Sequence, residues 1–321
     1  MFRGFIARAG IIGILVVSVA VLSVLSPHFL TVNNLTNILL QVAITTIIGV
    51  GMTFVILTGG IDLSVGAIVA LAIVVMAVVH KALAPMEFGV FQWPIVIGLP
   101  MLLALLTGTL TGLVNGVMVA RARVPAFIMT LGMMSMARGG AYIVSDNQTI
   151  SVFPDGLTFL GDGRVGGIPM LIIASLVIVA FAAWVLGRTI FGRYVYALGG
   201  NRVALRLSGV NAARVEMSVY AISGLACGIA SIALLGRLNV AQPVAGFGYE
   251  LDAIAAVIIG GTSIFGGEGK VANTLLGALL VGIIRNGLNL LNVSPNVQLL
   301  AIGSIIVAAV FLDKLRDSAR A

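Results

Sequence analysis

The chain has 321 residues, of which 60% are hydrophobic and 9% are charged, and its mean hydropathy is +1.17. In soluble proteins about a quarter of the residues are charged, so the 18 basic and 11 acidic residues here are too few to cover a water-exposed surface. The composition therefore excludes a soluble globular protein and a disordered chain, and it predicts a membrane protein.

The reactive and metal-binding residue types are scarce. One cysteine, Cys227, lies in an apolar run, and two histidines, His28 and His80, lie far apart. This pattern excludes a disulfide framework and a clustered metal site, and we expect Cys227 to pack in the core. The net charge of +7 comes from basic residues in short gaps between apolar runs. Membrane topology explains this charge better than binding to nucleic acid does.

Ten apolar stretches approach the roughly 20 residues that a helix needs to cross a bilayer. They run over Ala9–Leu25, Val42–Thr58, Val65–Val79, Pro94–Val119, Pro125–Val144, Pro169–Leu186, Val215–Leu235, Leu251–Phe265, Val271–Leu291 and Val297–Leu312. The pattern predicts an all-α integral membrane protein of about ten transmembrane helices. The third and eighth stretches are short, so eight full crossings with two partial or re-entrant helices is the alternative.

The first stretch follows Arg3 and Arg8 and has features of a signal peptide. Its apolar part is longer than a usual signal core, and no clear cleavage motif follows it. We therefore favour an uncleaved membrane anchor.

The distribution of basic residues predicts that both termini are cytoplasmic. With a cytoplasmic amino terminus, thirteen of the eighteen basic residues face inward: Arg3, Arg8, Arg121, Arg123, Arg188, Arg193, Arg202, Arg206, Arg214, Lys270, Lys314, Arg316 and Arg320. The longest internal loop is then 187–214 and the longest external loop is 145–168. Neither loop can hold a soluble enzymatic domain, so residues 1–321 form one polytopic domain.

Two pairs of segments suggest a weak internal repeat. Residues 55–60, VILTGG, resemble residues 257–261, VIIGG, and residues 110–116, LTGLVNG, resemble residues 280–287, LVGIIRNG. Internal repeats are common in transporters. Chance similarity among glycine- and valine-rich helices is the competing explanation.

The segment Thr58–Gly66, TGGIDLSVG, interrupts two apolar stretches with a glycine pair and a carboxylate. Lipid would leave such a backbone unsatisfied, so the segment must face protein or water. Asp62 and Ser64 are expected to cap the helix that follows. A direct role in substrate passage or gating is the alternative.

The second half carries a comparable segment, Tyr249–Lys270. Glu250 and Asp252 stand where an apolar stretch begins, which suits a helix amino terminus. The end of the segment is glycine-rich, but Ile264 stands where a P-loop has its first glycine and Val271 stands where it has Ser or Thr. The sequence therefore predicts no nucleotide site on this chain.

Two arginines lie inside predicted helices. Arg138 is near the outer face and is expected to anchor the structure. Arg285 is deeper, with Asn286 and Asn289 beside it, and either interhelical hydrogen bonds or a polar lining of the transport pathway explains it. Asn115 and Gln298 belong to the same polar set.

The internal loop contains a short helical pattern over residues 201–208. Asn201 is suited to an N-cap and Gly209 to a C-terminal stop. Such a helix either lies on anionic lipid or docks into a groove on a cytoplasmic partner.

These segments together resemble a known family. The motifs at residues 51–66, 193–201, 206–209 and 248–261 resemble those of the ribose-type permeases of bacterial ABC sugar importers, over about residues 26–313. The resemblance implies a multi-pass permease dimer in the inner membrane, made of two identical or closely related chains. It also implies separate cytoplasmic ATPase subunits and a periplasmic sugar-binding protein as partners, and no cofactor.

The resemblance also assigns residues. The loop that couples to the ATPase corresponds to Gly199, Gly200, Asn201, Arg206, Leu207 and Gly209. With the residues singled out above, the expected translocation pathway comprises Gly59, Gly60, Asp62, Ser64, Gly66, Asn115, Gly260, Gly261, Arg285, Asn286, Asn289 and Gln298. Members of the family often have aromatic residues where this chain has Asn296 and Val297, so the particular sugar stays open.

Two other classes of protein compete with this interpretation. An ion-coupled secondary transporter would usually rely on acids inside its membrane helices, whereas Asp62, Glu216 and Asp252 lie at the edges of the predicted ones. An intramembrane enzyme would need a nucleophile with a base or a metal-binding motif, and the sequence has neither. We therefore expect a transport subunit without catalytic residues or a metal.

Overall fold

The computed structural model describes residues 2–318. Arg320, counted above with the cytoplasmic charges, lies outside the described residues. The elements are α1 (Phe2–Leu25), α2 (Val32–Leu57), α3 (Val65–Leu83), η1 (Gly89–Phe91), η2 (Pro94–Gly98), α4 (Leu99–Ala120), α5 (Ala126–Val144), β1 (Ile150–Ser151), α6 (Asp155–Asp162), β2 (Arg164–Val165), β3 (Ile168–Pro169), α7 (Met170–Arg188), α8 (Ile190–Gly200), α9 (Arg202–Leu207), α10 (Ala212–Leu238), β4 (Val240–Ala241), α11 (Tyr249–Ile259), α12 (Val271–Leu290) and α13 (Pro295–Ser318).

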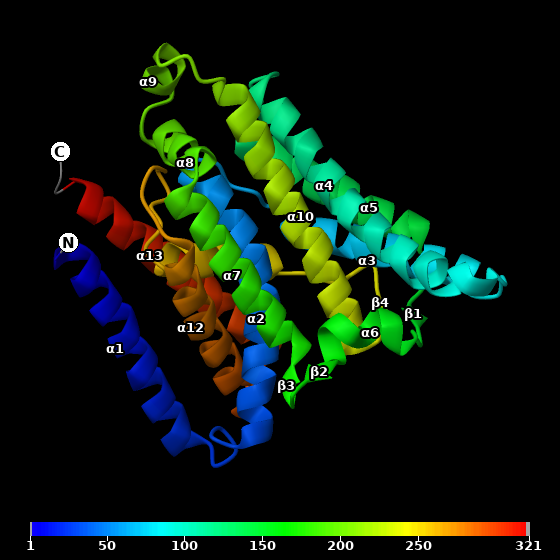
Figure 1. The fold of residues 1–321 in the computed structure, drawn as a ribbon. Coiled ribbons are helices and arrows are strands. Elements are labelled where there is room, and N and C mark those ends of the chain that lie inside the picture. Colours follow the sequence, from blue (N-terminus) through cyan, green and yellow to red (C-terminus); the bar gives the residue numbers. More distant parts are fainter. Residues whose placement is uncertain (1, 319–321) are drawn as a thin grey trace.

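The protein is an all-α membrane protein (Figure 1). Among the described residues, seven helical stretches are long and apolar enough to cross a bilayer: α2, α3, the stretch from η1 to the end of α4, α5, α7, α10 and α12. The described apolar parts of α1 and α13, Ile11–Leu25 and Pro295–Ala308, are shorter. A helix lies at each of the ten predicted stretches, while the number of helices that cross the membrane stays a prediction.

The two short stretches differ in the structure. The third becomes α3, whose 19 residues extend roughly 28 Å, close to the thickness of the hydrocarbon core. The eighth becomes α11, which has only 11 residues and extends about 16 Å. Because α11 ends at Ile259, six residues before the predicted end at Phe265, it fits a partial helix better than a full crossing.

Helices α2, α3 and α10 form the centre of the bundle. In their most apolar stretches 83%, 67% and 78% of the residues are buried, against 33%, 22% and 28% in the stretches containing α4, α5 and α7. The first three are therefore surrounded by protein, and the others lie at the periphery (Figure 1). Cys227 of α10 is fully buried and free, which confirms its predicted packing role.

Glycines bring α4 and α10 into close contact. A Cβ atom at Gly108 or Gly112 would lie 2.2 or 2.3 Å from a backbone carbonyl oxygen of α10. In return, a Cβ at Gly224 would lie 2.0 Å from the carbonyl oxygen of Gly108. Small residues at such spacing let membrane helices approach backbone to backbone. The glycine-rich composition therefore reflects helix packing.

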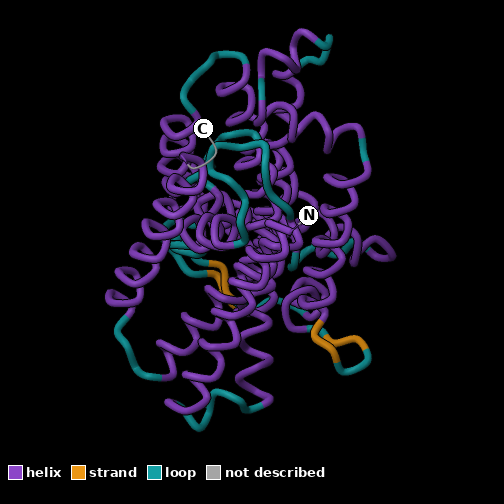
Figure 2. Tube along the Cα trace, turned by 90° about the vertical axis from the view of Figure 1, so that its left-hand side faces the viewer, coloured by secondary structure: helices purple, strands orange, loops and turns teal. Residues whose placement is uncertain are grey.

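The two longest loops lie at opposite ends of α10. Helices α8 and α9 are at one end, whereas α6 and the strands are at the other (Figure 1). Strand β1 pairs antiparallel with β4, and β2 pairs with β3 through a turn at Gly166 and Gly167, both with positive φ. Figure 2 shows how small these strand pairs are beside the helices. The predicted separation of loops 145–168 and 187–214 thus agrees with the structure.

The start of α2 differs from the sequence-based boundary. The apolar pattern begins at Val42, but the helix begins ten residues earlier at Val32, where the Thr31 hydroxyl accepts from the Asn34 amide at 3.4 Å. Residues 32–41 of α2 include several polar side chains, so the apolar pattern does not indicate this part of the helix. A helix longer than the hydrocarbon core explains the discrepancy.

Candidate functional site

A glycine pair turns the chain at the end of α2. The amides of Gly59 and Gly60 donate to carbonyl oxygens in the last turn of α2 at 2.9 and 3.1 Å. Gly59 has φ +79°, a left-handed conformation that favours glycine. A Cβ at Gly60 would lie 2.6 Å from the Tyr220 hydroxyl oxygen. The pair therefore lets the chain turn back into the bundle and run towards α3.

Asp62 lies in the segment between Gly60 and α3 and is completely buried. Oδ1 of Asp62 accepts from the amide and the hydroxyl of Ser64, at 3.0 and 2.5 Å. Oδ2 accepts from the hydroxyl of Ser223 on α10, at 3.1 Å. The Asn115 side chain on α4 donates to the Ser64 hydroxyl oxygen at 2.9 Å. This carboxyl thus joins the start of α3 to α10 and, through Ser64, to α4.

The role of Asp62 differs from the predicted helix cap in two respects. The Ser64 side chain at the start of α3 caps no helical amide, and Asp62 binds the turn before the helix instead. In addition, Ser223 lies roughly 17 Å along α10 from Ala212. Asp62 therefore lies inside the bundle, whereas the sequence places it at the edge of an apolar stretch.

The starts of α3 and α11 meet inside the protein. A Cβ at Gly66 would lie 2.3 Å from both the Glu250 carboxylate and the Gly246 carbonyl oxygen. Gly246 has φ +69°, and a Cβ there would lie 2.7 Å from the Gly66 carbonyl oxygen. Only glycines permit this contact between the two motifs. Helix ends that meet inside a bundle are typical of binding sites in transporters.

The two acids of α11 have different partners. Glu250 lies in the first turn of α11 as predicted, but it accepts from the amide of the N-cap residue Gly248, at 3.3 Å, and no side chain caps a helical amide of α11. Asp252 is buried and instead forms an ion pair with Arg285 of α12, at 2.6 Å. Asp252 is therefore not a cap, and the intramembrane charge of Arg285 has an acidic partner that the sequence did not identify.

Arg138 confirms its predicted anchoring role. Its Nη1 donates to the carbonyl oxygens of Pro243 and Ala245 at 2.7 and 2.8 Å. These carbonyls belong to the segment that leads from β4 into α11. The arginine thus fixes the approach to α11 through protein contacts.

The other polar residues of α12 and α13 form interhelical hydrogen bonds. The side-chain amides of Asn286 and Asn34 exchange two hydrogen bonds at 2.8 and 3.0 Å. Gln298 donates to the Asn289 side chain at 2.7 Å. These contacts favour the hydrogen-bonding alternative for this set.

The internal loop contains two helices. The Asn201 side chain accepts from the Ala204 amide at 2.9 Å and caps α9, and Gly209 has φ +82° just after α9 ends. These positions confirm the predicted cap and stop. The sequence did not indicate α8, whose N-cap is Thr189, bonded to the Gly192 amide at 3.1 Å.

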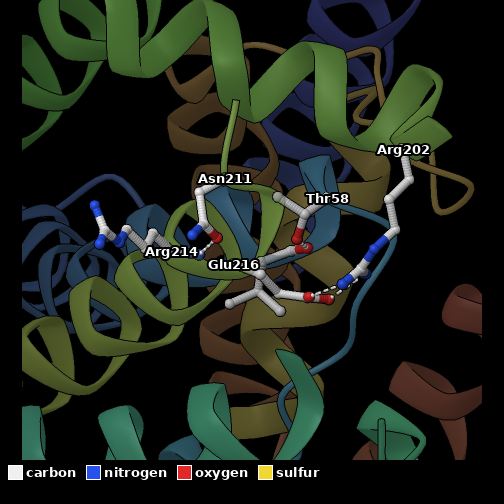
Figure 3. Close-up of polar contacts among 6 residues, drawn as sticks. Thr58, Arg202, Asn211, Arg214 and Glu216 are labelled. Atoms are coloured by element: carbon white, nitrogen blue, oxygen red, sulfur yellow. Dashed lines mark hydrogen bonds and ion pairs between the residues drawn. The ribbon is translucent and has the colours of Figure 1, made fainter. Parts of the chain in front are cut away.

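An ion pair holds α9 against α10. Arg202 donates to both carboxylate oxygens of Glu216, at 2.9 and 2.5 Å (Figure 3). On the exposed side of α9, Val203 and Leu207 lie one helical turn apart and are 66% and 84% exposed. The helix therefore has a fixed base and an apolar outer face.

Three segments meet where α2 ends. A Cβ at Gly199 would lie 1.9 Å from the Leu57 carbonyl oxygen, which itself accepts from the Gly267 amide at 2.9 Å. The Tyr196 hydroxyl donates to the Gly269 carbonyl oxygen at 2.8 Å. Burial raises the pKa of the Tyr196 phenol above its ordinary value. We call this contact of α2, α8 and the 260–270 loop the glycine junction.

Gly260 and Gly261 end α11 beside this junction. A Cβ at Gly260 would lie 2.7 Å from the Asn273 carbonyl oxygen on α12, and Gly261 has φ +83°. Like residues 55–60, residues 257–261 thus form a helix end closed by glycines. The internal repeat itself remains a prediction.

The predicted pathway residues fall into three groups. Gly59, Gly60, Asp62, Ser64, Gly66 and Asn115 surround the break before α3; Gly260 and Gly261 lie at the end of α11; Arg285, Asn286, Asn289 and Gln298 lie on α12 and α13. Among the described residues no hydrogen bond or ion pair joins one group to another, although Gly66 packs against Glu250 and Arg285 pairs with Asp252, both at the start of α11. Sequence reasoning missed Ser223, because a serine inside an apolar helix carries no signal of its partner.

Comparison with known proteins places the chain among transport permeases. Residues 34–310 match the family described as branched-chain amino acid transport system / permease component. The ribose import permease protein of Haemophilus influenzae is 42% identical over 97% of this chain and 92% of its own length. The corresponding proteins of Escherichia coli K12 and Bacillus subtilis are 44% and 40% identical, over 94% and 99% of this chain and 92% and 96% of their own lengths.

No solved structure matches the chain. The family match covers most of the sequence and includes both interrupted motifs, the internal loop and α12. The chain therefore belongs to the family of branched-chain amino acid transport system permease components.

Proposed function

We propose that this chain is the inner-membrane permease subunit of an ABC importer and forms the pathway for a monosaccharide, ribose or a similar sugar. A binding protein delivers the sugar from outside, and separate ATPase subunits supply the energy. The observation that carries the proposal is the identity of 40–44%, over almost the whole chain, to proteins named ribose import permeases.

In the proposed topology, ten helices lie in the membrane. Both termini and α9 lie on its cytoplasmic side. The excess of basic residues on that side supports it. A second permease chain, identical or closely related, completes the pathway, as the family resemblance implies.

The proposed pathway passes the meeting point of α3 and α11. Its support is the break at Gly59 and Gly60, the buried Asp62, and the contact of Gly66 with the start of α11. Non-helical backbone inside a membrane is tolerated where it is buried in protein or lines a water-filled cavity.

In the proposed coupling, α9 docks into a groove on the ATPase. The exposed Val203 and Leu207 supply an apolar face for docking, and Arg202 with Glu216 transmits its movement to α10. The glycine junction transmits movement of α8 to the ends of α2 and α11. ATP is hydrolysed on the ATPase subunit. The ATPase drives transport because it makes different contacts with the two states of the permease.

Charge reversal on α9 tests the coupling. Asn201→Glu removes the cap and Arg206→Glu reverses an exposed charge, so we expect the double variant to lose co-purification with the ATPase and most sugar uptake. Arg193→Glu, on the exposed side of α8, is the control for charge. Unchanged co-purification and uptake in the double variant would refute the assignment.

The buried Asp62 favours a second candidate, an ion-coupled transporter, because acids inside membrane helices carry ions in such proteins. The energy source separates the two. In cells that lack their own ribose uptake, the chain is expressed with its ATPase and binding protein, and labelled ribose is followed. The ABC proposal expects uptake to stop when the ATPase is inactivated; uptake that persists on the chain alone and follows an ion gradient supports the second candidate.

A further inference from the structure

A cavity of about 440 Å³ lies between α9, the end of α2 and the turn that joins α4 to α5. Its lining includes Thr58, Gly59, Arg123, Arg202, Arg206 and Glu216. Figure 3 shows Thr58 beside the ion pair of Arg202 and Glu216. The cavity thus connects α9 to the glycine pair that ends α2.

The charge of the lining is strongly unbalanced. The lining contains three arginines and one carboxylate, Arg123 and Arg206 are exposed, and Glu216 binds Arg202 with both oxygens. Among the described residues, no ion pair engages Arg123 or Arg206. Two positive charges therefore remain available to an anion.

The start of α5 adds to this positive field. Pro125 and Ala126 line the cavity, and no side chain caps the helix there. A 19-residue helix presents free amides and the positive end of its dipole at such a start. The helix start reinforces the two guanidinium groups.

Arg123, which lines the cavity, has a strained backbone conformation. Its φ is +58°, a conformation that residues with a Cβ adopt only at a cost of order 1 kcal/mol. The neighbouring Arg121 is exposed like Arg123, but it has a negative φ of −103° and does not line the cavity. Of the two arginines in this turn, Arg123 lines the cavity and Arg121 does not.

We propose that this cavity binds a phosphate group, either as free phosphate or in the headgroup of an anionic lipid. Arginine guanidinium groups and helix starts are the usual partners of phosphate oxygens. Phe127 and Ile128, 57% and 60% exposed at the start of α5, offer an apolar surface for acyl chains beside the cavity. The proposal does not depend on the transported sugar.

The test compares Arg123→Gln with Arg121→Gln in the full-length chain, reconstituted in phosphatidylcholine nanodiscs. The thermal midpoint is measured against inorganic phosphate in one arm and against increasing phosphatidylglycerol in the other, since a ligand that binds the folded state raises the midpoint. Loss of one charge-assisted hydrogen bond predicts about tenfold weaker binding in Arg123→Gln. Arg121→Gln is expected to bind like the wild type.

An Arg123-dependent shift with inorganic phosphate identifies free phosphate, and one seen only with phosphatidylglycerol identifies the lipid. Equal responses of the two variants in both arms would overturn the proposal. Arg123→Gly relieves the positive φ and guards against a folding defect in Arg123→Gln. It should lose binding to the same extent, and full binding by it would also overturn the proposal.

Discussion

The two halves of the chain each bury an aspartate near the start of an interior helix, but they hold it differently. Asp62 is bound by the amide and hydroxyl of Ser64 and the hydroxyl of Ser223, without a cation among the described residues. Asp252 is bound by the guanidinium of Arg285. The first site rests on neutral donors and the second on an ion pair.

This difference determines how each site responds to loss of charge. Removing one member of a buried ion pair leaves the other charge uncompensated in a medium of low dielectric constant. A carboxyl held by amide and hydroxyl donors can be replaced by a side-chain amide, whose oxygen accepts and whose NH2 group donates. The second half should therefore be more sensitive than the first to an isosteric Asp→Asn change.

The largest effect is expected for Asp252→Asn. The Arg285 side chain, only 21% exposed, would lose its ion-pair partner. The free energy of unfolding should fall by about 3 kcal/mol, measured by denaturation of the purified protein in detergent.

The double variant Asp252→Asn/Arg285→Met is the control. It removes both charges and should recover most of the stability. A double variant as unstable as the single one would show that the ion pair is not the cause.

Gly66→Ala tests the contact between the two halves. Its Cβ would overlap the Glu250 carboxylate and the Gly246 carbonyl oxygen, each 2.3 Å away. Overpacking of this kind should cost about 2 kcal/mol of unfolding free energy. Gly132→Ala on α5, where no atom lies within 4 Å, is the matched control and should be neutral or slightly stabilising. Equal stability of the two variants would contradict the contact.

Ser223→Ala sharpens the account of the first site. It removes one donor to Asp62 and should cost about 1.5 kcal/mol of unfolding free energy in the same denaturation assay. Ser218→Ala lies on the exposed side of α10, where the hydroxyl only donates to its own helix, and should have little effect. If both serines behave alike, Asp62 does not depend on α10.

The smallest effect is expected for Asp62→Asn, below about 1 kcal/mol, because the amide can keep the contacts to Ser64 and Ser223. The measurement is again the free energy of unfolding, alongside Asp252→Asn. If the two variants lose equal stability, the distinction between the two halves is wrong.

Local features of the sequence predicted local structure well. The glycine pair at 59–60, the cap at Asn201 and the stop at Gly209 each act within a few residues, and the structure places them as expected. The short eighth apolar stretch likewise matches the 11-residue α11. Propensity and hydropathy carry such information because the interactions are close in the chain.

Partners far apart in the chain could not be predicted. Asp62 and Ser223 are 161 residues apart, and Arg138 and Ala245 are 107 apart. Their pairing depends on how α4 and α5 pack around α3 and α10, which the apolar pattern does not specify. For the same reason, the sequence predicts interhelical hydrogen bonds or a pathway lining for Arg285 and a helix cap for Asp252. It does not predict that the two residues form an ion pair.

The most direct test of the proposed function is sugar uptake into proteoliposomes that contain the chain and its ATPase, with the binding protein outside and ATP trapped inside. We predict uptake of labelled ribose or a similar sugar that requires ATP, the ATPase and the binding protein together. Uptake by this chain alone, driven by a proton or sodium gradient and indifferent to ATP, would contradict the account.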